Sequence, residues 1–254
     1  MMNTISYQDI ITRCHGVKKD TYRLYYYHRL LALPLTKFFY YFNVKPNTIS
    51  LAMIVLSILS FFLMIFGEST LFLLGFLLAI LAFLFDKIDG DLARLYGVAN
   101  IKGAVYDFVY HRFSLFLFYL GIGIHYADQN PYMIGIAATV GFIANYIEEM
   151  QLLPHRVFAH KYILKGEHIN HVHTQEYLEP LAIKALKVFR TQLFLFYYFA
   201  LGIMLNYFFE NMVFIFMLFA LIGSVIYALA QLYSMMNHTF DYEIEMLDKS
   251  VKGV

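Results

Sequence analysis

Acidic residues at helical spacing occur in two neighbouring stretches of an otherwise apolar sequence. Asp86 and Asp89 are three residues apart, and Asp107 and His111 are four residues apart, so each pair shares a face if its stretch is helical. Three carboxylates brought together with an imidazole repel one another unless a cation lies between them. Carboxylate oxygens suit Mg²⁺ or Mn²⁺, which also bind phosphate oxygens. The spacing therefore predicts a divalent-metal site where the two stretches meet; the alternative is an acidic loop that only caps two helices.

The composition places these charges in a membrane protein. Of 254 residues, 60% are hydrophobic and 15% are charged, against about 45–50% and about 25% in soluble proteins. This hydrophobicity excludes a disordered chain. The formal net charge of +1 supplies no basic surface for nucleic acid, and a single cysteine excludes both an intramolecular disulfide framework and a multi-cysteine zinc site. We expect a polytopic integral membrane protein that binds no nucleic acid.

Apolar stretches of membrane-spanning length occur six times. A bilayer core of about 30 Å needs about 20 helical residues, and we expect spans at 49–66, 71–85, 104–125, 132–152, 191–208 and 212–234. The second stretch is short unless its last turn includes the charged residues after Phe85. The expected fold class is all-α integral membrane, with six transmembrane helices after an N-terminal interfacial amphipathic helix over 20–43, which Pro34 should break or kink.

Basic residues fall on one side of this arrangement. The 19 Lys and Arg residues lie in alternate connections, with Arg112 a little inside the third span, and none lies in the turns 67–70, 126–131 and 209–211. The positive-inside rule then places both termini and the acidic site in the cytoplasm. We divide the chain into a cytoplasmic N-terminus with the interfacial helix (1–48), a six-span domain with a cytoplasmic loop at 153–190 (49–234), and a cytoplasmic tail (235–254).

The cytoplasmic loop is rich in histidine, which raises the alternative of a transition-metal site. It lacks the second ligand cluster that a structural metal site usually has. We therefore expect a solvated, partly helical loop that its basic residues hold near anionic headgroups. Its histidines are His155, His160, His168, His171 and His173.

The two charged stretches together fit a longer spaced motif, D-x2-D-G-x2-A-R-x8-G-x3-D-x3-D. Seven of its eight positions match, at Asp86, Asp89, Gly90, Ala93, Arg94, Gly103 and Asp107. This motif resembles the signature of the CDP-alcohol phosphotransferases, also called CDP-alcohol phosphatidyltransferases, with His111 in place of the last Asp. The likeness extends over residues 20–235, because the expected spans, the interfacial helix and the pair Pro46-Asn47 at the start of the first span are also similar to the family.

The resemblance implies a metal-dependent enzyme of phospholipid biosynthesis. Members of the family transfer a phospho-alcohol (phosphatidyl-type) group from a CDP-linked donor to an acceptor hydroxyl and release CMP. Carried over to this chain, the family's ligands for two Mg²⁺ or Mn²⁺ ions are Asp86, Asp89, Asp107 and His111. The implied CDP-binding residues are Asn47, Gly90, Ala93, Arg94 and Gly103. A homodimer in the lipid bilayer is implied as well.

His111 is the one departure from the signature, and it bears on catalysis. The family's last Asp is the proposed base for the acceptor hydroxyl, and it also contacts metal beside the carboxylate that Asp107 matches. An imidazole with an ordinary pKa of about 6.5 suits both roles, so we expect His111 to be the base, with Asp107 beside it.

The substrates and two rival functions are left open by the sequence. We favour a CDP-activated lipid, such as CDP-diacylglycerol, with a small polar alcohol as acceptor. The reverse pairing is a soluble CDP-alcohol donated to a lipid hydroxyl. The rival functions are a catalytically silent relative that binds CDP and metal, and a membrane scaffold or transporter.

Overall fold

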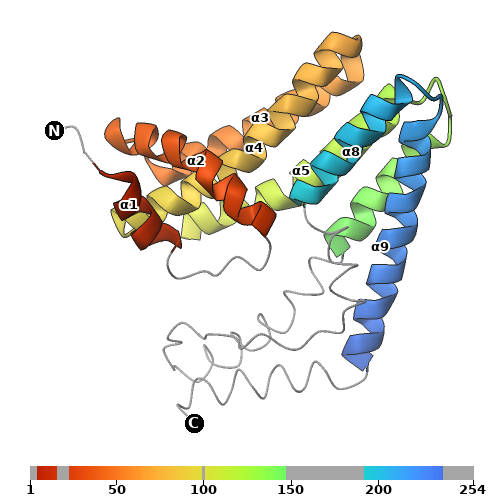
Figure 1. Cartoon of the computed structure of the whole chain (residues 1–254). Helices are drawn as coiled ribbons and strands as arrows, with labels where there is room; N and C mark the ends of the chain where they lie inside the picture. The colour runs from red at the N-terminus through yellow and green to blue at the C-terminus, as the bar shows by residue number, and fades with distance from the viewer. Residues whose placement is uncertain (1–4, 16–22, 99–100, 147–191, 237–254) are drawn as a thin grey trace.

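The protein is helical throughout the part that the structure describes. The computed structural model describes residues 5–15, 23–98, 101–146 and 192–236, and these ranges contain no strand (Figure 1). The labelled elements are α1 (Tyr7–Ile10), a π-helical turn η1 (Ile11–His15), α2 (Arg23–Tyr41), α3 (Pro46–Phe66), α4 (Ser69–Tyr96), α5 (Ile101–His125), α8 (Gln192–Asn206) and α9 (Met212–Met236). A further apolar helix, Met133–Tyr146, follows α5. The all-α fold class predicted from the sequence is confirmed.

Within the described ranges, three helices are long and apolar enough to cross a membrane: α3, α4 and the Met212–Ala230 part of α9. The helices Met133–Tyr146 and Leu195–Asn206 are apolar but shorter. α5 covers the expected third span and carries charged residues in its first half. Each expected span therefore coincides with a helix, while the count of six transmembrane helices stays a prediction.

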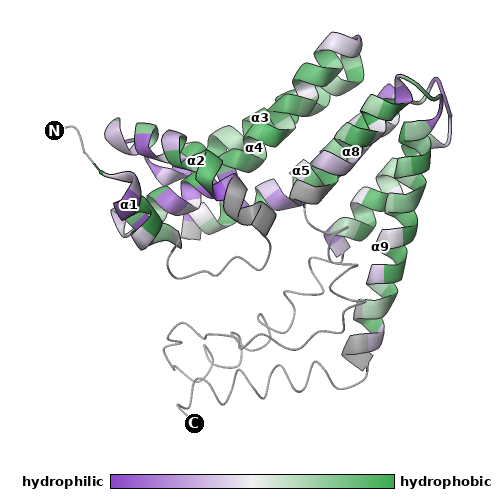
Figure 2. Cartoon of the chain, in the orientation of Figure 1, coloured by the Kyte–Doolittle hydropathy of each residue, from purple (hydrophilic) through white to green (hydrophobic). Residues whose placement is uncertain are grey.

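The second apolar stretch continues as a helix well beyond Phe85, as its short length required. α4 runs without interruption to Tyr96, so the charged motif residues lie on the last turns of an apolar helix. It ends at Gly97, which has a left-handed φ of 63°, and the Gly97 N–H donates to the carbonyl of Arg94. Glycine adopts this conformation without the strain that a Cβ would add. Figure 2 shows that most residues of α3, α4, α8 and α9 are hydrophobic, whereas α1 and α2 mix hydrophilic and hydrophobic residues.

Close packing between α3 and α4 fixes where the motif residues lie. A Cβ at Gly75 would be 2.7 Å from the Ser60 carbonyl oxygen, so only glycine allows this approach. The Ser60 hydroxyl donates to the Gly75 carbonyl at 2.7 Å. Around this contact, a core from α3, α4, α5, Met133–Tyr146, α8 and α9 buries large aromatic side chains, among them Phe72, Phe76, Phe83, Phe118, Tyr119 and Phe199.

The amphipathic helix α2 packs on α3 and α4. Its Ala32 is buried against Ile88 and Leu92 of α4. Of the two outcomes expected at Pro34, a break does not occur, because α2 is continuous from Arg23 to Tyr41. Pro34 lies on the exposed face, whereas the neighbouring Ala32 and Leu33 are buried. Burial of the opposite face therefore stabilises the helix and offsets the loss of the backbone hydrogen bond that Pro34 cannot donate.

The N-terminal segment Tyr7–His15, for which no helix was predicted from the sequence, packs on the end of α4. Ser6 begins α1 through a capping box with Asp9. Ile10 and Cys14 are buried in a cluster with Leu33 of α2 and Leu95 of α4. The predicted loop at 153–190, with its histidines, lies outside the described residues, as does the end of the predicted fourth span.

Candidate functional site

A cavity of about 430 Å³ lies between the start of α3, the last turns of α4 and the start of α5. Its volume falls in the range of about 300–1,000 Å³ that is usual for ligand pockets. All nine site residues named from the sequence line it: Asn47, Asp86, Asp89, Gly90, Ala93, Arg94, Gly103, Asp107 and His111. The structure thus brings together residues that are up to 64 positions apart in the sequence.

Asp86, Asp107 and His111 form the tightest group in the cavity. One potential ligand atom from each lies within 4.8 Å of the others. The Nε2 atom of His111 is 3.3 Å from Oδ1 of Asp86 and 3.4 Å from Oδ1 of Asp107. The Asp86 side chain is 7% exposed and that of Asp107 is 51% exposed. The group therefore joins a buried carboxylate on α4 to an open carboxylate on α5.

Asp89 lines the same cavity but lies outside that group of three. Its Oδ2 atom accepts a hydrogen bond of 2.7 Å from the hydroxyl of Ser50, a buried residue in the first turns of α3. This bond fixes the Asp89 carboxylate relative to α3. Three carboxylates and one imidazole are a donor set that fits Mg²⁺ or Mn²⁺, with the nitrogen ligand favouring Mn²⁺.

Basic side chains line the cavity beside the acids. Lys87 forms an ion pair with Asp86, and its Nζ atom lies 4.7 Å from the centre of the Phe83 ring. Arg94 forms an ion pair with Asp91, with Nη2 2.6 Å from Oδ1. Arg29 reaches the cavity from α2. A cavity that combines cations with carboxylates able to hold a metal ion suits a phosphate-bearing ligand.

Four polar or charged lining residues were not among the site residues predicted from the sequence: Arg29, Ser50, Lys87 and Asp91. Lys87 and Asp91 occupy variable positions of the motif, and the spacing of Asp91 to Arg94 is one at which helical side chains meet. That spacing could have been used to predict the ion pair from the sequence. No sequence pattern could have predicted the position of Arg29, because it depends on how α2 packs against α4.

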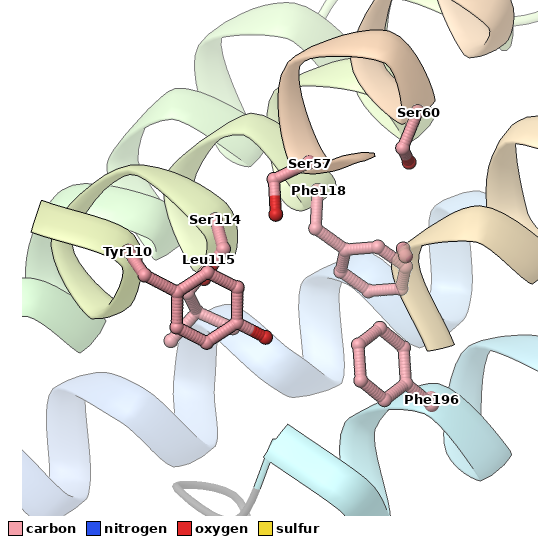
Figure 3. A pocket seen from close by; sticks show the side chains of 8 residues that line it. Ser57, Ser60, Tyr110, Ser114, Leu115, Phe118 and Phe196 are labelled. Atoms are coloured by element: carbon pink, nitrogen blue, oxygen red, sulfur yellow. The ribbon is translucent and has the colours of Figure 1, made fainter. Parts of the chain in front are cut away.

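A second cavity lies farther along the same helices (Figure 3). Ser57 and Ser60 of α3, Tyr110 and Ser114 of α5, and Phe196 of α8 are among its lining residues, and none of those lining residues is charged. Its volume of about 10 Å³ is close to the least that one water molecule needs. It is too small for any part of a nucleotide or lipid headgroup, so the larger cavity is the candidate active site.

Comparison with known proteins agrees with the motif and the cavity. The family model of CDP-alcohol phosphatidyltransferase matches residues 43–226, which include α3, α4, α5 and the Met133–Tyr146 helix. An uncharacterised protein of Aquifex aeolicus (strain VF5) is 40% identical over 124 residues. That match spans 47% of this chain and 61% of the relative's length. With the family model covering most of its length, the chain belongs to the CDP-alcohol phosphatidyltransferase family.

Proposed function

We propose that this protein is an integral membrane enzyme that moves a phosphatidyl-type group from a CDP-linked donor to an acceptor hydroxyl and releases CMP, with a requirement for divalent metal. The observation that supports this most is the convergence of the residues at all eight motif positions, together with Asn47, on one cavity of substrate size. A silent relative that binds CDP and metal would have the same cavity, so turnover is what distinguishes it from the proposed enzyme. The intact acidic positions Asp86, Asp89 and Asp107 favour a working enzyme over a silent one.

The metal-binding residues in this proposal are Asp86, Asp89, Asp107 and His111. Divalent ions held there would offset the charge that develops on the pyrophosphate as it is cleaved. The residues are arranged for this before substrate arrives, since Ser50 orients Asp89 and His111 lies between Asp86 and Asp107. Preorganised groups of this kind cost little reorganisation during the reaction.

The donor's nucleotide and phosphates are assigned to the α4 side of the cavity. Ala93 and Gly103 have small side chains that let a nucleotide approach the helices closely, and Asn47 lines the same cavity from α3. Gly90 contributes by letting the Arg94 guanidinium lie close over the surface of α4. Arg94 is placed to bind phosphate oxygens, because its planar guanidinium can donate two hydrogen bonds to them at once. Lys87 and Arg29 add positive charge to the same cavity.

His111 is the proposed base for the acceptor. A neutral imidazole has a single lone pair, so His111 can either ligate a metal ion or accept a proton at any one moment. For the base role, the proton lies on Nε2, which faces Asp86 and Asp107, and the lone pair lies on Nδ1. In the proposed step that ring takes the proton of the acceptor hydroxyl. The acceptor oxygen bonds to the phosphorus that carries the alcohol, the bond between this phosphorus and the bridging oxygen of the pyrophosphate breaks, and CMP leaves with the electron pair.

The substrate pairing we favour is a CDP-activated lipid with a small polar alcohol. The site lies where α4 changes from apolar to charged residues, so lipid chains can stay in the bilayer while the nucleotide meets water. The cavity and both termini are assigned to the cytoplasm on the distribution of Lys and Arg. A homodimer is expected from the family, and its test is the molar mass of the purified protein in detergent.

The experiment is a CMP-release assay on purified protein. CDP-diacylglycerol and soluble CDP-alcohols are each offered with polyols, amino alcohols, phosphorylated alcohols and diacylglycerol, with Mg²⁺, with Mn²⁺ and with chelator. Metal-dependent CMP release with one donor and acceptor pair supports the proposal and identifies the substrates. A folded protein that binds CDP but releases no CMP with any pair is a silent relative and contradicts it.

A further inference from the structure

The ion pair between Asp91 and Arg94 places the guanidinium that faces the donor. Asp91 has a side chain only 2% exposed, and its Oδ1 atom lies 2.6 Å from Nη2 of Arg94. Arg94 itself is 38% exposed. Its guanidinium lies over Gly90, where a Cβ would be 3.4 Å from Nη2 and 3.5 Å from Nη1. The arginine therefore crosses the surface of α4 at a residue without a side chain and is held from below by a buried carboxylate.

Asp91 is in turn held by the N-terminal segment. The Cys14 thiol donates a hydrogen bond of 3.6 Å to the backbone carbonyl of Asp91. Burial raises the pKa of this thiol to about 11, so Cys14 keeps its proton at neutral pH and remains a donor. Ile10 and Cys14 pack on Leu95, one residue beyond Arg94. The last turn of α4 is thus fixed from outside the cavity.

We propose that Asp91, which is not part of the family motif, is a positioning residue that fixes Arg94 for the donor's phosphates. This rests on the proposed function. An exposed arginine without a partner samples many rotamers, and ordering it on binding costs conformational entropy. One nitrogen paired with Asp91 removes much of that cost in advance, and the guanidinium keeps further N–H donors for phosphate oxygens.

The rival role for Asp91 is a purely structural one, in which it stabilises the end of α4 whether or not Arg94 is there. The two roles differ in one measurable respect. A positioning role acts through Arg94, so replacing Asp91 has no further effect on CDP binding once Arg94 is gone. A structural role acts independently, so the two effects add.

The experiment is a double-mutant cycle on the full-length protein in detergent, with CDP affinity measured by calorimetry alongside donor KM and kcat. We expect Asp91→Asn to weaken CDP binding and raise donor KM about tenfold while kcat changes less than about threefold, since hydrogen bonds to charged groups are among the stronger ones. Asp91→Asn/Arg94→Ala should bind CDP as Arg94→Ala does. Asp91→Glu, which keeps the carboxylate, should restore affinity to within about threefold of wild type.

Controls separate this proposal from loss of fold and from failure of the proposed function. Asp128→Asn removes an exposed carboxylate in the turn that follows α5 and should leave CDP affinity unchanged. Additive effects in the cycle overturn the proposal, and so does loss of the folded state in both Asp91→Asn and Asp91→Ser. CDP affinity is measured without turnover. If wild type binds CDP and releases no CMP, the proposed function fails and the cycle still decides the role of Asp91.

Discussion

The two cavities along α3 and α5 differ in how their polar groups are satisfied. Ser50 and Ser57 are seven residues apart, so they share a face of α3 at a separation of about 10 Å. At the small cavity, Ser57 donates to the carbonyl of Met53 at 2.9 Å, so the backbone of its own helix satisfies it. At the large cavity, the Ser50 hydroxyl lies 3.2 Å from the carbonyl of Pro46 in its own helix and, at 2.7 Å, also contacts Oδ2 of Asp89 on α4.

The difference shows where the protein keeps charged side chains although their burial near the membrane costs free energy. A serine in an apolar helix is inexpensive because it bonds to the preceding turn. A carboxylate has no proton to donate to that turn and costs several kcal/mol near the membrane unless it is paired. At the large cavity each carboxylate contacts a partner. Asp86 contacts Lys87 and His111, and Asp107 contacts His111. Asp89 contacts Ser50, and Asp91 contacts Arg94. The small cavity therefore fits a packing irregularity, whereas the large cavity is the candidate functional site.

The largest predicted difference between the cavities is in catalysis. Asp86→Asn should lower kcat by about 10³-fold, because it removes a buried charge at the proposed metal site. Ser57→Ala, the matched change at the small cavity, should keep kcat within about twofold of wild type. Both are measured by CMP release from the donor identified for wild type. Equal losses in the two variants would mean that the cavities do not differ in function.

His111 gives the next largest effect and tests its proposed role as base. His111→Ala should lower kcat by about 10²-fold, the usual contribution of a positioned general base. His111→Asp restores the residue that the family has there and should match or exceed wild type. The measurement is kcat for both variants at matched melting temperature. Wild-type turnover by His111→Ala would exclude the imidazole as the base.

Ser50 tests how far α3 orients the site. Ser50→Ala removes the hydrogen bond to Asp89 and should lower kcat/KM about tenfold, the value of a bond to a charged group. Ser50→Thr keeps the hydroxyl and serves as the control. The measurement is kcat/KM for both variants in steady-state kinetics. An unchanged kcat/KM in Ser50→Ala would show that the orientation of Asp89 does not depend on the hydrogen bond from Ser50.

Ser114 at the small cavity should give the smallest effect. Its hydroxyl is buried beside Tyr110 and makes no hydrogen bond of good geometry to any described residue. Ser114→Ala removes an unsatisfied group, so it should raise the melting temperature by about 2 °C and leave kcat within about twofold of wild type. Thermal unfolding in detergent measures the first effect. A marked loss of activity would link the small cavity to the chemistry.

The sequence was enough to predict that the candidate residues lie together, but not which of them contact one another. Helical spacing was enough to place Asp86 with Asp89, and Asp107 with His111, because an antiparallel connection between α4 and α5 brings the two faces together. Which carboxylates lie closest depends on side-chain rotamers, and there Asp89 lies apart from the other three groups.

Helical spacing and spaced motifs could not predict contacts between elements that are far apart in the sequence. Arg29 enters the cavity only because α2 packs on α4, and Cys14 reaches Asp91 only because the N-terminal segment packs on the end of that helix. Neither packing is encoded in a local period or a spaced motif. The continuity of α2 through Pro34 has the same origin, since packing of the opposite face outweighs the local cost of proline.

The central claim is that the charged cavity of this family member carries out a metal-dependent transfer. The most direct test is CMP release from CDP-diacylglycerol by wild type and by Asp86→Asn, with Mg²⁺ or Mn²⁺ and then with chelator, across the panel of acceptor alcohols. The account predicts CMP release by wild type that stops with chelator, returns with added metal, and is almost absent in Asp86→Asn. Release that is unaffected by chelator and by Asp86→Asn would contradict it.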